Sequence, residues 1–290
     1  MSKNYKPSKQ HYLPQVYLRG FAHDNEKLKV YSLKQPYAKI SSKSIKGICY
    51  EPGLYDTDDE NGEKTDEIEK VFFAKHIEPI FNRLLATVKD KKWLSNSDIA
   101  DLSIYISLQL LRLPSSFRVI NNLMTDSLVK NGYHKIETLP NNKETIDDRE
   151  VILKISKDDT IRAAFSLATP LSDKLCRMKW IFMFAPRGTA FITSDMPVAV
   201  ISPESNGYSR TDFGGFGLPG AITIFPLSKD ICIFLQNGDY GQSFPTISKH
   251  ATKDINGVMS DKFVLYLISH SKKLLQSFAP KLLSQRESLT

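Results

Sequence analysis

Two short segments of the sequence hold side chains suited to acid–base and phosphate chemistry. They are KQHYLPQVYLRGF near the start of the chain and TAFITSDMPV beyond its middle. Their polar residues are His11, Gln15, Tyr17 and Arg19 in the first, and Thr193, Ser194 and Asp195 in the second. Histidine transfers protons near neutral pH, arginine stabilises charge on phosphate oxygens, and a carboxylate orients an imidazole or binds a divalent cation. These residue types indicate phosphoryl chemistry if the fold brings the two segments together.

The positions of both segments are unusual for a plain scaffold. Chain ends normally fray, yet the first segment crowds polar and aromatic side chains around Pro14. In the second, the apolar run AFIT predicts a strand, and Asp195 follows it at a position where ligands are often bound. Each residue also has a structural interpretation, in which His11 anchors the terminus through a backbone carbonyl and Asp195 makes a turn before Pro197. The sequence leaves both interpretations open.

Apolar periodicity divides the chain into four stretches that must position these segments. They are a β-rich head at 1–60, a helical stretch at 65–135, a mainly β-sheet stretch at 150–250 and a helical tail at 250–290. Helices are predicted over 65–90 with Thr65 as the N-cap, from Asn96 or Ser97 to Pro114, over 115–131 and over 160–178. The polar stretch 136–150 is predicted to be a loop.

Five apolar or alternating runs predict a sheet in the second half. They are KWIFMFAP, TAFITSD, VAVIS, AITIFPL and DICIFLQ, and the tail that follows returns to helical spacing through Leu267 and Ile268. This order predicts an α+β class, in which the helical first half and the C-terminal helices pack around a mainly antiparallel sheet within a single integrated domain. The short strands of the head cannot bury themselves alone, so we expect the head to pack on the C-terminal sheet.

Composition limits the class of protein. The chain has 290 residues, of which 41% are hydrophobic and 24% charged, and this excludes disordered, fibrous and disulfide-scaffold classes. Its three cysteines are far apart and outside any C-x-x-C spacing, and no apolar run is long enough to span a bilayer. We therefore expect a cytoplasmic protein with no membrane partner. Its net charge of +7 is compatible with binding to nucleic acid.

The chain has no P-loop, H-E-x-x-H, paired C-x-x-C or G-x-S-x-G motif, but it resembles a known family. The pattern H-Y-x-P-x-x-Y-L-x-x-F, with which members of the bacterial domain of unknown function 4238 begin, is matched by His11, Tyr12, Pro14, Tyr17, Leu18 and Phe21. The resemblance covers nearly the whole chain. Its further matching positions are Glu69 and Glu78, then Gln109, Arg112 and Pro114 in the pattern Q-x-x-R-x-P, then FITSDMPV, the FPLS of 225–228 and Asn256. The family name implies no activity.

The residues selected by this resemblance complete a candidate site. Its catalytic residues would be His11, Glu78, Arg112 and Asp195, and its substrate-binding residues Gln15, Tyr17, Arg19, Gln109, Thr193 and Ser194. Arg112 lies among leucines and Asp195 follows an apolar strand, so both charges should be buried. Because buried charges need partners, we expect His11, Arg112 and Asp195 to meet in one cleft with Glu78 close by. In the alternative interpretation, Glu78 and Arg112 form an ion pair that only stabilises the helices.

Two functions follow from such a site. The first is a nuclease-like or other phosphoryl-transfer effector acting on nucleic acid, for which a divalent metal ion is the expected kind of cofactor. The second is a non-catalytic component of a defence or toxin operon, in which the same Arg and Gln side chains bind a nucleotide or a protein partner without turning it over.

Overall fold

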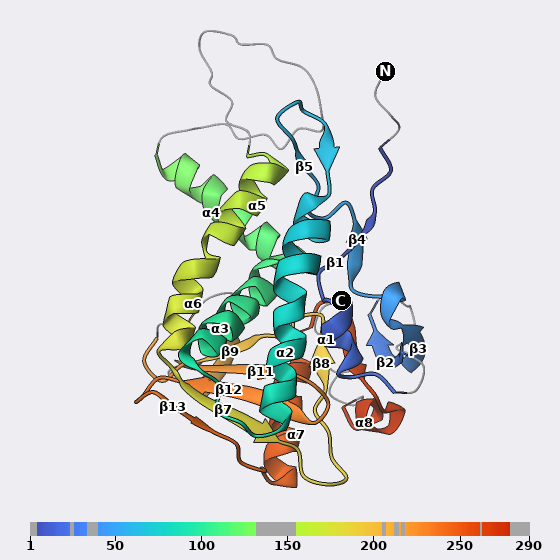
Figure 1. Cartoon of the computed structure of the whole chain (residues 1–290), viewed down its shortest axis with the longest axis vertical. Helices are drawn as coiled ribbons and strands as arrows, with labels where there is room; N and C mark the ends of the chain where they lie inside the picture. The colour runs from blue at the N-terminus through green and yellow to red at the C-terminus, as the bar shows by residue number, and fades with distance from the viewer. Residues whose placement is uncertain are drawn as a thin grey trace.

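The computed structural model describes residues 5–23, 26–33, 40–131, 155–204, 207–211, 215, 218–261 and 263–278. Helices and mainly antiparallel sheets give the α+β class that the sequence predicts. Figure 1 shows a broad sheet with α7 on one side and the helices α3 and α6 on the other. Among the described residues, no helix combines the length and the apolar composition needed to cross a membrane. The polar stretch 136–150 lies outside the described residues.

The broad sheet has six strands in the order β10-β9-β11-β12-β7-β13. Their bounds are β7 (Lys179–Phe184), β9 (Ala199–Glu204), β10 (Gly207–Thr211), β11 (Ile222–Pro226), β12 (Ile231–Gln236) and β13 (Gly241–Ser243). Neighbouring strands are antiparallel except β13, which runs parallel to β7. Four of the five predicted runs therefore form this sheet.

Helices cover both faces of this sheet. A strand with both faces buried needs no alternating polar residues, which explains the nearly continuous apolar run KWIFMF. Trp180 and Phe182 of β7 belong to one buried cluster together with Ile106 of the helical stretch. Met183 belongs to a second cluster with Met259, on the side of α7 (Lys249–Asp261). Successive side chains of a strand point to opposite faces, so one strand contributes to two cores.

The helical stretch begins later and more irregularly than predicted. Its members are the π-helix η3 (Ile68–Ile77), α2 (Glu78–Lys89), α3 (Asn96–Leu111) and α4 (Pro114–Lys130). The helix predicted over 160–178 is divided into α5 (Lys157–Ser166) and α6 (Ala168–Cys176). Thr65 is not a cap, because it lies in the two-residue strand β6 (Lys64–Thr65). The N-cap of α3 is Ser95 rather than Asn96 or Ser97, since Ser95 and Asp98 form a reciprocal capping box.

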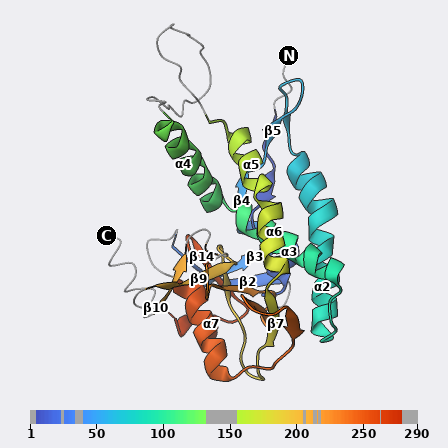
Figure 2. The same cartoon turned by 90° about the vertical axis from the view of Figure 1, so that its left-hand side faces the viewer.

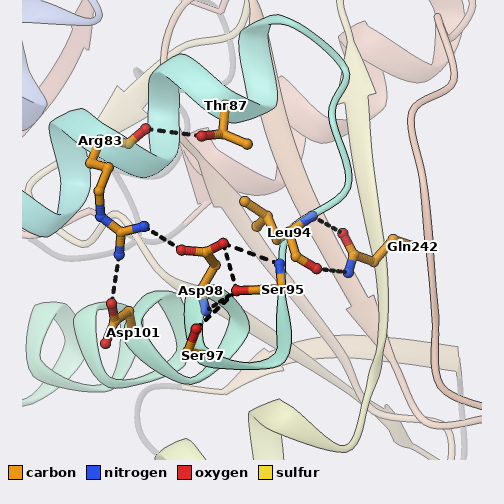
Figure 3. Close-up of polar contacts among 8 residues, drawn as sticks. All are labelled: Arg83, Thr87, Leu94, Ser95, Ser97, Asp98, Asp101 and Gln242. Atoms are coloured by element: carbon orange, nitrogen blue, oxygen red, sulfur yellow. Dashed lines mark hydrogen bonds and ion pairs between the residues drawn. The ribbon is translucent and has the colours of Figure 1, made fainter.

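Side-chain contacts join α2, α3 and the edge strand β13 (Figure 3). Arg83 of α2 forms ion pairs with Asp98 and with Asp101, the second at 2.6 Å. The Gln242 side chain accepts from the Leu94 N–H at 2.9 Å and donates to the Leu94 carbonyl at 2.7 Å. Gln242 thus bonds to both backbone groups of Leu94 in the loop before α3, as a neighbouring strand would.

We predict that Gln242→Met lowers the free energy of unfolding by about 2 kcal/mol, because the apolar side chain leaves the buried Leu94 N–H and carbonyl without partners. Urea unfolding of the variant measures the loss. Thr87→Ala is the control. Within the described residues the Thr87 hydroxyl donates to the Arg83 carbonyl at an exposed site, so its removal should change stability by less than about 0.5 kcal/mol. Equal losses in the two variants would show that the Gln242 contact does not stabilise the fold.

The head pairs with the C-terminal part of the chain, as expected. Its elements are β1 (Lys9–His11), α1 (Gln15–Arg19), β2 (Lys27–Ser32), β3 (Ile40–Ser44), the 3-10 helix η2 (Ile45–Gly47), β4 (Tyr50–Pro52) and β5 (Thr57–Asp58), which pairs with β6 just beyond the head. A four-stranded sheet has the order β3-β2-β14-β8, with β14 at Tyr266–Ser269 and β8 at Thr193–Ser194. This pairing confirms that the head packs on C-terminal strands.

Two predictions about this region are wrong. Leu267 and Ile268 were expected in a helix, but they lie in β14, between α7 and the short helix α8 (Lys272–Gln276). A short apolar run does not distinguish a helix from a strand, and here pairing with β2 and β8 decides. The run TAFITSD was assigned to the large sheet, yet only Thr193 and Ser194 are in a strand, and that strand belongs to the smaller sheet.

Candidate functional site

The first segment is fixed by Gln10 and by the backbone of His11. Gln10 is buried, its amide donates to Asp56, and its carbonyl oxygen accepts from the Tyr55 N–H. The His11 N–H donates to Glu69 Oε1 at 3.1 Å. Strand pairing between β1 and β4 adds further backbone contacts. The first segment is therefore anchored by the Gln10 side chain and by the backbone of His11.

The His11 imidazole is buried against the Tyr50 ring, with 5.6 Å between the ring centroids. Its Nε2 has no hydrogen-bond partner among the described residues. Burial, together with the nearby Arg112 charge, lowers the pKa of His11 to about 4. The ring is therefore neutral near pH 7.

Arg112, at the C-terminal end of α3, joins three parts of the chain. Its Nη2 donates to the His11 carbonyl at 2.6 Å and to Glu69 Oε2 at 3.4 Å. Its Nε donates to the Tyr55 hydroxyl at 3.3 Å, while that hydroxyl donates to the Arg112 carbonyl at 2.8 Å. The guanidinium carbon lies 3.7 Å from the centroid of the Phe73 ring. Only 1% of Arg112 is exposed, so its donors are directed at the protein itself.

Glu69, rather than Glu78, is the carboxylate paired with Arg112. Glu78 begins α2 and makes no ion pair within the described part of the chain. Burial raises the pKa of Glu78, and the charges of Arg112 and Arg19 partly offset that effect. Burial likewise raises the pKa of Glu69, against the opposing effect of Arg112. Both carboxyls thus lie near enough to Arg112 to interact with its charge.

The predicted substrate-binding residues mostly bind other parts of the protein. Gln109 donates to the Tyr12 carbonyl at 2.9 Å, and its Oε1 has no partner among the described residues. The Tyr17 hydroxyl lies 2.7 Å from the Thr193 hydroxyl and so connects α1 to β8. Arg19 is exposed and forms an ion pair with Glu26, and Gln15 is half-buried.

The end of α1 lies very close to the loop that contains the FPLS motif. A Cβ atom at Gly20 would lie 3.0 Å from the Leu227 carbonyl oxygen, so only glycine fits without displacing this backbone. The Lys229 N–H also donates to the Gly20 carbonyl at 2.9 Å. This contact fixes the first segment against the large sheet.

Asp195 joins the second segment to the residues that lead into β14. Its two carboxylate oxygens accept from the Val264 N–H at 3.0 Å and from the Leu265 N–H at 2.6 Å. The turn is made by Ser194 instead, whose hydroxyl donates to the Met196 carbonyl and accepts from the Met196 N–H. Burial raises the pKa of Asp195 to about 6, although the backbone hydrogen bonds act against this change.

A cavity of about 460 Å³ opens beside Asp195. Its apolar walls come from Tyr12, Leu54, Pro114, Phe117, Val264 and Leu265, and its polar groups from Glu51, Ser115, Arg118, Lys157 and Asp195. Asp195 is the one predicted catalytic residue that lines it. The structure therefore brings His11, Arg112 and Glu69 together in one buried cluster, and places Asp195 on a cavity with other residues.

Sequence reasoning missed Arg118, Lys157 and Phe117. Arg118 follows Pro114 by about one helical turn, and Lys157 begins α5, where charged residues usually face solvent. No spacing signal separates such residues from an ordinary helix surface. Within the described ranges, no group of three or more His, Cys, Asp or Glu side chains is placed to hold a metal ion.

Comparison with known protein families gives a match over most of the chain. The family described as "Protein of unknown function (DUF4238)" matches residues 9–273, in agreement with the resemblance carried by the opening motif. No curated protein and no solved structure matches the chain.

Proposed function

Because the chain belongs to the DUF4238 family, whose description gives no activity, we propose its function from the cavity beside Asp195: it binds a nucleotide, free or at the end of a nucleic acid. One observation carries this proposal. A single cavity combines aromatic and apolar walls, two basic side chains and two carboxyl groups, the buried Asp195 and the exposed Glu51. These three features match the base, the phosphate and the amino groups of a nucleotide.

The walls suit a flat base. Tyr12 and Phe117 contribute rings and Leu54 an aliphatic side chain to the same cavity. Bases stack on aromatic side chains, and stacking stabilises a complex by about 1–3 kcal/mol per base. A volume of about 460 Å³ also lies within the usual range for small-molecule sites.

The basic side chains suit a phosphate. The side chain of Arg118 is exposed and makes no hydrogen bond or ion pair with another described residue, so its donors are available. Lys157 donates to the Gly53 carbonyl, and burial lowers its pKa. Arginine binds phosphate through two parallel N–H groups, whereas lysine acts as a point charge. This pair therefore favours a ligand with an anionic group at the edge of the cavity.

Asp195 suits the polar edge of a base. Its oxygens accept from the Val264 and Leu265 N–H groups, and the Tyr266 N–H also acts on this carboxyl, whereas a carboxylate has about four lone-pair sites. Adenine, guanine and cytosine carry exocyclic amino groups that donate such bonds. A hydrogen bond from such an amino group to Asp195 would therefore favour a base over a flat ring that has no amino group.

Isothermal titration with AMP and with adenosine tests this proposal. We predict that Arg118→Gln weakens AMP binding about tenfold, because it removes a charged, bidentate phosphate contact, and that it leaves adenosine binding unchanged. Arg162→Gln is the matched control, since Arg162 is exposed on α5 and lines neither this cavity nor its neighbour. Absence of AMP binding at millimolar concentration, or equal affinities in the two variants, would contradict the proposal.

A phosphoryl-transfer activity is the second candidate, and the pKa of Asp195 favours it. With a pKa near 6, this buried carboxyl can accept or donate a proton close to neutral pH, which is what a general acid or base requires. Labelled single-stranded RNA and DNA, incubated with and without Mg²⁺, test this activity. Cleavage by the wild type that Asp195→Asn abolishes would support it, and cleavage that persists in the variant would exclude Asp195 as the catalytic residue.

A further inference from the structure

A second hollow of about 330 Å³ adjoins the cavity. It lies between α4 and α5, which Figure 2 shows side by side and which contact each other along their packed faces. Phe117, Arg118 and Lys157 line both hollows. The two basic side chains thus form a boundary that a ligand could contact from either side.

The second hollow has a different chemical character from the first. Beyond the shared residues it is lined by Asn121, Asn122, Thr160 and Ile161, which are neutral. Asn121 donates to the Thr160 hydroxyl at 3.1 Å, so that part of the wall is fixed. The side chain of Asn122 is exposed and has no partner among the described residues. An asparagine amide both donates and accepts, as the edge of a base or a sugar hydroxyl requires.

We infer that the two hollows are successive nucleotide subsites, with the connecting phosphodiester at Arg118 and Lys157, so that the ligand class is a dinucleotide or a single-stranded oligonucleotide. This inference rests on the proposed function. A mononucleotide with its base beside Asp195 reaches the two cations and fills one side only. The next nucleotide then lies against Asn122 and Ile161.

The distribution of charge distinguishes this ligand from a nucleoside triphosphate. The second hollow contributes no basic residue besides the two that it shares with the first. The additional charges of a triphosphate would therefore meet neutral amide, hydroxyl and apolar groups. A phosphodiester needs only the cations that are present, and its second base has neutral partners.

Isothermal titration with AMP, the dinucleotide ApA and ATP tests the inference. ApA should bind about tenfold more tightly than AMP, because it uses the second hollow as well. Asn122→Ala should weaken ApA binding and leave AMP binding unchanged. Asn82→Ala, an exposed asparagine on α2 that lines neither hollow, is the matched control and should change neither affinity.

The outcomes separate the two proposals. If neither AMP nor ApA binds, the proposed function fails. If AMP binds and ApA binds no more tightly, or if Asn122→Ala affects both ligands equally, the second subsite is refuted while the nucleotide site stands. If ATP binds more tightly than ApA, the second hollow accepts phosphates, and the dinucleotide inference is wrong.

Discussion

Replacing Arg112 with methionine should lower the free energy of unfolding by about 3–5 kcal/mol, the range measured when one partner of a buried charged pair is removed. The guanidinium neutralises Glu69, binds the His11 carbonyl and the Tyr55 hydroxyl, and covers the Phe73 ring. Methionine replaces the ring contact only. The buried His11 carbonyl and the half-buried Glu69 carboxylate would lose their partner, and the desolvation cost of both groups would remain.

Urea unfolding at pH 7 measures the effect, and Arg83→Met is the matched control. Arg83 also contacts two carboxylates, Asp98 and Asp101, but its side chain is 52% exposed. Exposed ion pairs contribute little, so the control should lose less than about 1 kcal/mol. Similar losses for the two variants would mean that burial does not govern the strength of the Arg112 contacts.

A milder variant keeps this prediction testable if Arg112→Met does not fold. Tyr55→Phe removes only the hydroxyl that bonds to Arg112, and it should cost about 1–2 kcal/mol because the buried Arg112 carbonyl loses its donor. An unchanged free energy of unfolding in Tyr55→Phe would contradict the assignment of this cluster to stability.

His11 and Asp195 should give folding stability opposite dependences on pH. His11 has a pKa lowered from 6.5 to about 4, so between these values the unfolded chain binds the proton more strongly. The wild type therefore loses stability as pH falls through this window. Asp195 has a pKa raised from 3.8 to about 6, so the folded state binds the proton more strongly. Its contribution is fully present below pH 3.8 and is lost as pH rises through 6.

Two variants separate these contributions. Relative to the wild type, the free energy of unfolding of His11→Gln should rise by about 3 kcal/mol as the pH falls from 7 to 4. That of Asp195→Asn should rise by about 3 kcal/mol as the pH rises from 4 to 7. Both figures follow from the pKa shifts, because one pKa unit corresponds to about 1.4 kcal/mol. Unfolding by urea at pH 4, 5, 6 and 7 measures both differences. Asn82→Ala should follow the wild type, since this exposed side chain carries no titratable group. Parallel curves for all the variants would refute the assigned shifts.

Arg112 illustrates how far the sequence could lead. A charged residue among leucines predicts a buried partner, and Glu69 and the first segment supply it. Two of its acceptors, however, are a backbone carbonyl and a tyrosine hydroxyl, which no charge pattern reveals. The partners of Asp195 are backbone amides some 70 residues away, brought close by β14. Backbone partners carry no residue-type signal, so pairing by opposite charge was the wrong criterion for Asp195.

The fold could be predicted where periodicity was long and clear. The helices α3 and α4 and the strands β7, β11 and β12 have strong apolar patterns and lie near their predicted positions. The strand β14 has four residues, too few for a period, and its pairing depends on distant strands. Arg118 and Lys157 were missed for a related reason. A helix surface charge is common, and only the packing of α4 beside α5 brings these two together.

The pairing of β2 with β14 has a consequence for the order in which the protein folds during synthesis. Val30 lies opposite Ile268, so β2 has only β3 beside it until the residues of β14, more than 230 positions later, have left the ribosome. Contacts between residues so distant in the chain form slowly, because the loop between them must first be closed. During that time one edge of β2 is unpaired, and such an edge can bind the strand of another molecule. A nascent chain stalled before residue 266 would remain in this aggregation-prone state, with the N-terminal motif already synthesised and its sheet incomplete.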